Sequence, residues 1–376
     1  MLTDKELSAL QNELIDIYSK IEIELILSVA KRLDTYNTVD GVLNWQLKKL
    51  SELNVLNKDL LRIIAKYSSK TQKAIENMLK QAMLANLDKE YLGEAFKKGV
   101  TDITYESLIK TPKINKLLKS NIYELSEHLS LINTKAIEST KEVYVKTLNK
   151  AYVEAYSGVY SPQEAIAKGI KEMAKSGIKG ATYESGRSIG IEPAVRRDTL
   201  SAIISNVNKV SIETCKELGT NYVEVSKHLG ARVSDKSKIA NHAGWQGKVY
   251  QIEGSDKYGN LEEETGYGQI EGLGGVNCRH RVFPYFEGIS KPKQDQISQE
   301  ENKEVYQASQ RIRALEREFR NNKRLWYTCK QIGDKDQKKK CEAKSKDILD
   351  QIKEIEDKYP DIGSSSSRTL VLEDLL

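Results

Sequence analysis

The 376-residue sequence contains little of what marks membrane, secreted or disordered proteins. It has only six prolines and four phenylalanines, and no apolar run approaches the roughly 18 residues of a membrane helix. Its four cysteines are too few for a disulfide scaffold, and no basic segment followed by an apolar core opens the chain. With 39% hydrophobic and 30% charged residues, it is also not typical of a disordered chain. We therefore expect a soluble protein made in a reducing cytoplasm, with no membrane partner.

Apolar spacing predicts helices over most of the first 155 residues. Leucine, isoleucine and valine recur at intervals of three and four between Leu7 and Val29. Ser161 and Glu164 form a capping box that opens another helix, and Glu192 begins one that runs to Gly219. The other expected helices span 42–53, 57–84, 89–98 and 105–149.

The pattern changes after Gly219. Tyr222–Val225 and Lys248–Ile252 are typical of strands. Seven of the 22 residues in Gly254–Gly275 are glycines, a density that predicts a loop with positive-φ positions. We thus predict an α+β fold that is mostly α. Its expected parts are a helical domain (1–178), a small α+β domain (179–291), a basic antiparallel helical hairpin (292–362) and a flexible tail (363–376).

A heptad pattern predicts the hairpin. Apolar positions repeat every seven residues from Val305 to Trp326, and Gly333-Asp334 separates this helix from a returning one. Cys329 and Cys341 are equally distant from the turn and lie on the apolar seam. We therefore expect their sulfurs to face each other near the tip of the hairpin.

The hairpin also carries an excess of positive charge. Arg311–Lys346 contains 13 lysines and arginines against 5 acidic residues. This segment is either the solvated face of a helical pair or a surface that binds duplex DNA weakly, without sequence preference and with strong salt dependence. The candidate DNA contacts are Arg311, Arg313, Arg317, Arg320, Lys323 and Arg324.

Three of the four histidines and one cysteine fall within 53 positions, at His228, His242, Cys278 and His280. They are candidate ligands of a tetrahedral zinc ion, or polar residues that tie the glycine-rich loop to a small sheet, or a cysteine nucleophile with its base. Otherwise we expect no cofactor. We predict that His242, Trp245, Cys278 and His280 lie close together.

The order of motifs in this region is distinctive. Ser226–Arg232 is followed by Asn241–Tyr250 and then by Gly272–His280. This order resembles the phage minor capsid protein 2 family, with a looser likeness to Mu F-type head-morphogenesis proteins. The residues that carry the motif are His228, Arg232, His242, Trp245, Gln246, Gly247, Asn277, Cys278, Arg279 and His280.

The resemblance implies a structural protein of a tailed bacteriophage or prophage. Such a protein acts in head assembly near the portal, inside the capsid, after synthesis in the host cytoplasm. Its partners would be the portal and other capsid or scaffold proteins. The resemblance implies no known enzymatic activity and no catalytic residues. The alternative is a head-carried enzyme or toxin-like effector that uses the four His and Cys residues named above.

Overall fold

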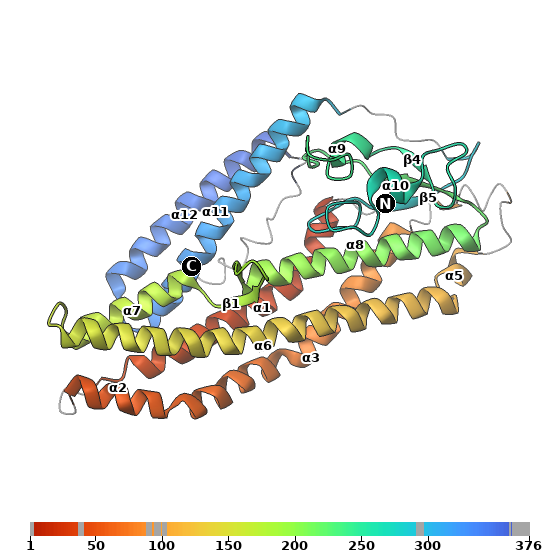
Figure 1. Ribbon diagram of the computed structural model, residues 1–376. Helices are drawn as coiled ribbons and strands as arrows, with labels where there is room; N and C mark the ends of the chain where they lie inside the picture. The colour runs from red at the N-terminus through yellow and green to blue at the C-terminus, as the bar shows by residue number, and fades with distance from the viewer. Residues whose placement is uncertain are drawn as a thin grey trace.

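The computed structural model describes residues 4–36, 41–87, 92–93, 99, 104–290, 297–360 and 362. Long helices pack together, with the C-terminal pair inclined to the others, and a small β-containing unit sits at one side of them (Figure 1). The long helices are α1 (Asp4–Leu33), α2 (Gly41–Ser51), α3 (Leu53–Asn86), α6 (Pro112–Tyr156), α7 (Pro162–Ser176), α8 (Ile191–Glu217), α11 (Gln299–Gln331) and α12 (Lys335–Lys358). This arrangement confirms the mostly α, α+β fold class.

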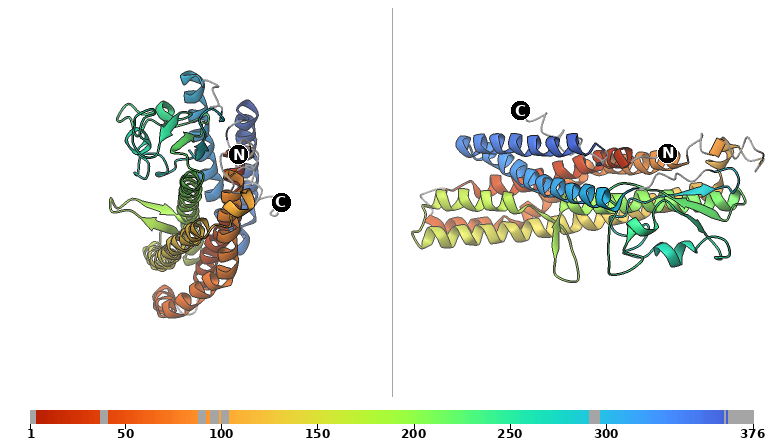
Figure 2. Two further views of the ribbon diagram at one scale, coloured as in Figure 1. Left: turned by 90° about the vertical axis from the view of Figure 1, so that its right-hand side faces the viewer. Right: turned by 90° about the horizontal axis from the view of Figure 1, so that it is seen from above.

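Shorter elements connect α7 to α8 and α8 to α11 along the chain. They are the strands β1 (Lys179–Thr182), β2 (Ser188–Gly190), β3 (Tyr222–Val225), β4 (Val249–Gln251) and β5 (Val282–Tyr285), with the helices α9 (His242–Trp245) and α10 (Leu261–Thr265). Figure 2 shows that the β1–β2 hairpin and the unit around β3–β5 project from the same side of the helical layer. None of the described helices is both long and apolar enough to span a membrane.

Side-chain caps explain where two of the long helices begin. The Thr111 hydroxyl accepts from the backbone of Ile114 and the Ser161 hydroxyl accepts from that of Glu164, each just before a proline at the first helical position. The single helix expected over 105–149 is therefore wrong at one place, because α5 (Tyr105–Leu108) ends before α6 begins. Most of the helix expected over 89–98 lies outside the described residues.

One hydrophobic cluster joins α1, α3, α6, α7 and α8. Leu14, Leu79, Leu148, Ile170 and Val207 are all fully buried in it. The α8 helix enters this cluster because its apolar residues face α6, α1 and α3. The bundle core therefore continues past the domain boundary expected at residue 178.

The small unit is built on a three-stranded antiparallel sheet of order β4-β3-β5, in which Val223 lies between Tyr250 and Pro284. The first two strands match the sequence prediction, whereas β5 was missed. Pro284 lacks an N–H and is uncommon within strands, but it is tolerated here because β5 is an edge strand. In the glycine-rich loop, a side chain at Gly272 would place a Cβ 2.2 Å from the Gly266 carbonyl oxygen. The close return of this chain segment therefore requires glycine.

The predicted hairpin is present as α11 and α12, separated by a short turn. Cys329 and Cys341 are buried free thiols in one apolar cluster with Leu325 and Trp326. The Asn322 amide donates to the Cys341 carbonyl and to the Ser345 hydroxyl, which joins the two helices across the seam. The α11 helix also packs against α1 and α7, so the hairpin is attached to the bundle through α11. The expected tail, 363–376, lies outside the described residues.

Candidate functional sites: a histidine cluster and an arginine cleft

The structure brings the four predicted His and Cys residues together. His242 is the first residue of α9, while Cys278 and His280 lie in the segment that leads into β5. One nitrogen of each of these two histidines and the Cys278 sulfur all lie within 4.8 Å of one another. The His228 ring lies 4.4 Å from the His280 ring, centroid to centroid. We call these four residues the histidine cluster.

Trp245 and Gln246 hold the cluster in place. The Trp245 ring lies 4.5 Å from the His242 ring and 4.7 Å from the His280 ring, and its indole N–H donates to the Ile239 carbonyl. The Gln246 side-chain oxygen accepts from the His228 backbone N–H at 3.0 Å and lies 3.1 Å from His280 Nε2. The expected proximity of His242, Trp245, Cys278 and His280 is therefore observed.

Burial favours the neutral forms of His242, Cys278 and His280. Desolvation, aided by the positive charges of Arg232 and His228, lowers the pKa of His242 to about 4, although the hydrogen bond to the Glu271 carbonyl acts in the opposite direction. Desolvation also lowers the pKa of His280 well below its ordinary value and raises that of the Cys278 thiol. A nucleophilic cysteine needs the opposite, a lowered pKa and access to substrate. With Cys278 only 2% exposed, the arrangement suits a structural or metal-binding role better than nucleophilic catalysis.

The other motif residues have separate places. Arg232 donates to the carbonyls of Glu271 and Val276, at 3.4 and 3.0 Å, and so fixes the end of the glycine-rich loop. Gly247 and Asn277 both have positive φ, 70° and 58°. Gly247 lies against the Lys227 side chain. These residues shape the loops around the cluster rather than contribute donor atoms to it.

Arg279 belongs to a second feature, a cleft of about 550 Å³ between the β1–β2 hairpin, α8, the loop before β5, and α11. Glu316 is the carboxylate among its lining residues. The arginines that line it are Arg187, Arg196, Arg197, Arg279, Arg313, Arg317 and Arg320. We call this feature the arginine cleft.

Carboxylates at the edge of the cleft neutralise only part of this charge. Glu192 pairs with Arg196 at 2.8 Å and with Arg320 at 3.3 Å, and Asp198 pairs with Arg197 at 2.5 Å. Burial lowers the pKa of Arg313, and the positive charges of Arg279 and Arg196 act in the same direction. The cleft is therefore a strongly electropositive concavity, which favours an anionic ligand.

The structure corrects the expected DNA surface of the hairpin. Lys323 and Arg324 are buried, at 5% and 9% exposure, because they turn toward α1 and α7. Arg324 pairs with Glu22 and Lys323 donates to Ser19. These two side chains are used inside the protein and are not available to phosphate.

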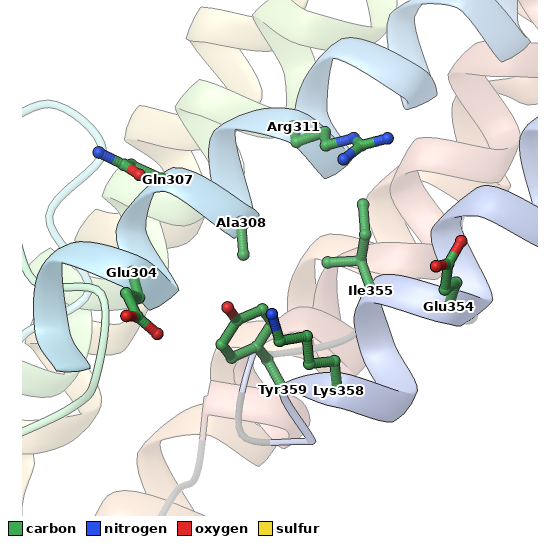
Figure 3. A pocket seen from close by; sticks show the side chains of 8 residues that line it. All are labelled: Glu304, Gln307, Ala308, Arg311, Glu354, Ile355, Lys358 and Tyr359. Atoms are coloured by element: carbon green, nitrogen blue, oxygen red, sulfur yellow. The ribbon is translucent and has the colours of Figure 1, made fainter.

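The four remaining candidates divide between two places. Arg313, Arg317 and Arg320 line the arginine cleft. Arg311 instead lines a groove between α11 and α12, together with Lys358 and the carboxylates Glu304 and Glu354 (Figure 3). The charges in that groove balance, so it has no preference for an anion.

Four residues of the cleft were not predicted to act as a group: Arg187, Arg196, Arg197 and Arg279. They come from the turn after β1, from α8 and from the loop before β5. None of these segments carries an excess of positive charge comparable to that of the hairpin. A charge count along the sequence could not have found a cluster that only the packing of distant elements creates.

Comparison with known proteins defines the class of the molecule. The family model described as phage minor capsid protein 2 matches residues 2–355. The chain therefore belongs to the phage minor capsid protein 2 family, and it is a structural protein of a bacteriophage particle.

Two relatives agree with this assignment. A protein named "Structural protein" from Lactococcus phage LL-H is 26% identical over 339 residues, which cover 85% of this chain and 86% of that protein. A second "Structural protein", from Lactococcus phage mv4, is 29% identical over 92 residues, or 24% of this chain and 75% of that protein. No solved structure matches the chain.

Proposed function

We propose that this minor capsid protein acts in head assembly near the portal, on the inner side of the capsid, and that it contacts the packaged DNA through the arginine cleft. The observation that carries the DNA contact is the gathering of seven arginines and one glutamate around one concavity. Because phosphate contacts carry no sequence information, the binding would be non-specific and would weaken steeply as salt rises.

Arg187 and Arg317 are the exposed arginines of the cleft and the ones best placed to meet a DNA backbone. The test measures binding of the full chain to a short duplex at low and moderate salt. We expect Arg187→Glu and Arg317→Glu each to weaken binding about fivefold or more at low salt. Arg311→Glu is the matched control, because it changes the net charge equally on the same helix as Arg317 but outside the cleft.

The outcomes separate three interpretations. Equal weakening by Arg311→Glu would assign the binding to overall charge rather than to the cleft. Binding that ignores salt, or that is absent at low salt, would contradict the DNA contact. Displacement of DNA by polyglutamate at equal charge concentration would instead indicate an acidic protein segment as the natural ligand.

Contact with the portal and other capsid or scaffold proteins is supported by apolar side chains on the outer face of α2 and the start of α3. Leu43, Leu47, Val55 and Leu61 are each more than half exposed. Leu43 and Leu47 are four positions apart on α2 and so share one helix face, and exposed apolar side chains gathered on one face are typical of protein interfaces. We expect Leu43→Lys/Leu47→Lys to reduce co-purification with portal protein, while Ile270→Lys, a control at a still more exposed apolar residue on the glycine-rich loop, leaves it unchanged.

A reconstruction of the phage particle tests the location directly. We expect density for this chain inside the head next to the portal. Density on the outer surface of the capsid, or in the tail, would contradict the proposal.

A further inference from the structure

The histidine cluster has the composition and hydrogen bonding of a metal site. We propose that His242, Cys278 and His280 bind a structural zinc ion, with His228 as the fourth ligand. Imidazole nitrogens and cysteine thiolates are both ligands of tetrahedral zinc. This inference rests on geometry within the small unit and is independent of the proposed DNA contact.

Hydrogen bonds fix which nitrogen of each ring carries the proton. His242 Nε2 lies 2.8 Å from the Glu271 carbonyl oxygen, which can only accept, so Nε2 is protonated and Nδ1 keeps its lone pair. His280 Nε2 lies 3.1 Å from the Gln246 side-chain oxygen. That oxygen is identified because it also accepts from a backbone N–H, that of His228. His280 is therefore protonated at Nε2 as well, with its Nδ1 lone pair directed to the Cys278 sulfur at 3.6 Å.

This is the arrangement that surrounds metal ligands in proteins. A ligating histidine donates its other ring N–H to a carbonyl or amide oxygen, which sets the tautomer and orients the ring. Both His242 and His280 have such an acceptor. Arg232 holds the Glu271 carbonyl from the other side, so the acceptor itself is fixed.

His228 completes the set. Its Nδ1 lies 3.0 Å from the Leu229 carbonyl oxygen, which leaves the lone pair on Nε2. Its ring lies 4.4 Å from that of His280. Donor atoms around a tetrahedral zinc ion lie about 3.5 Å apart. The three donors found within 4.8 Å would thus need only small side-chain rotations to close on the ion.

The position of the histidine cluster indicates a structural role for the ion. It would connect α9 to the segment before β5, the two ends of the region that contains the glycine-rich loop. The apolar core of this unit is small, and includes Val223, Trp245, Leu273 and Val282. A small core gains more from a metal cross-link than a long helical bundle does.

Metal content of the purified full chain provides the first test. We expect about one zinc per chain, retained through dialysis against weak chelator and lost with strong chelator. Cobalt should replace zinc and give the absorption bands of a tetrahedral site with a thiolate ligand. Cys278→Ser should abolish the thiolate band and lower the zinc content at least tenfold. Cys215→Ser is the matched control, because Cys215 is equally buried but lies outside the cluster.

If a variant fails to fold, measurements on the wild-type protein alone still test whether the chain binds zinc. We expect strong chelator to lower the thermal midpoint of the chain by several degrees, and added zinc to restore it. A folded wild-type chain with no bound zinc and no cobalt spectrum would overturn the proposal. Zinc content unchanged by Cys278→Ser would place the ion elsewhere, and retention of full zinc by His228→Gln would remove His228 from the ligand set.

Discussion

Two groups of basic residues on α11 have opposite surroundings. Lys323 and Arg324 turn into the bundle, where Arg324 pairs with Glu22 at 3.4 Å and donates to the last carbonyls of α7. Arg313 and Arg317 face the arginine cleft, where Glu316 is the carboxylate among the lining residues. Both groups belong to the same basic segment of the sequence, so their positions in the sequence do not distinguish them. Carboxylates from distant elements decide which cations stabilise the fold and which are left to attract a ligand.

The buried group carries a desolvation cost that its partners must offset. Burial lowers the pKa of Lys323 to about 8, although Glu192, Asp16 and Glu22 act against this shift. Gly177, with φ of 66°, lets the chain pass beside the Arg324–Glu22 pair. A Cβ there would lie 2.8 Å from both side chains. The Arg324–Glu22 ion pair is therefore part of the packing of α11 on α1 and α7.

The largest expected effect is that of removing Arg324. Arg324→Met leaves the Glu22 carboxylate buried without its cation, and we expect a loss of about 3–5 kcal/mol in the free energy of unfolding. Urea denaturation measures it. The double variant with Glu22→Gln should recover part of the loss. A change below about 1 kcal/mol would mean that this half of α11 is not fixed by the pair.

The second prediction concerns the rotation of α11, which determines which arginines face inward. Because Cys329 and Cys341 share one buried cluster, refolding in an oxidising buffer should join them in a disulfide. By loop closure, the bond should stabilise the chain by about 2–3 kcal/mol. Peptide mapping identifies the bond, and Cys341→Ala should abolish it. Pairing of Cys329 with any other cysteine would show that the hairpin register is wrong.

Glu192 lies between the buried and the cleft-facing basic residues of α11, and its ionisation makes the stability of the fold depend on pH. Burial opposes its ionisation, but the charges of Arg320 and Arg196 prevail and lower its pKa below the ordinary 4.5. The ionised form therefore stabilises the fold above about pH 4.5, and this contribution is lost as pH falls through the folded-state pKa.

We accordingly expect Glu192→Gln to cost about 1–2 kcal/mol at pH 7, since the arginines it pairs with are only partly buried. The difference from wild type should shrink as the pH is lowered toward 3. Denaturation curves at a series of pH values measure it. A difference that grows on acidification would contradict the lowered pKa.

The smallest expected effect on stability is that of Arg317→Gln. Its exposed side chain should contribute less than about 0.5 kcal/mol to folding. Its removal should nevertheless reduce the salt dependence of DNA binding by about one phosphate contact. Arg311→Gln should change neither quantity. A large stability loss for Arg317→Gln would contradict the distinction between basic residues of α11 that stabilise the fold and those that are available to a ligand.

Local signals predicted much of the framework. The capping box at Ser161, the strands around Val223 and Tyr250 and the heptad seam through Cys329 all appear where the sequence placed them. Two features were missed because local rules conflict there. Pro284 argues against the strand it occupies, and Thr111-Pro112 divides a continuous helical pattern into two helices.

The sequence by itself determined most of the helices, the hairpin turn and the meeting of His242 with Cys278 and His280, because these depend on periodicity, capping and the concentration of rare residue types near one loop. Only the tertiary structure decided the roles of the arginines. Arg187, Arg279 and Arg317 share a cleft, whereas Arg324 is neutralised by Glu22, which lies 302 positions away. Charge acts through space over a few ångströms, so its consequences depend on which distant segments pack together and not on their order along the chain.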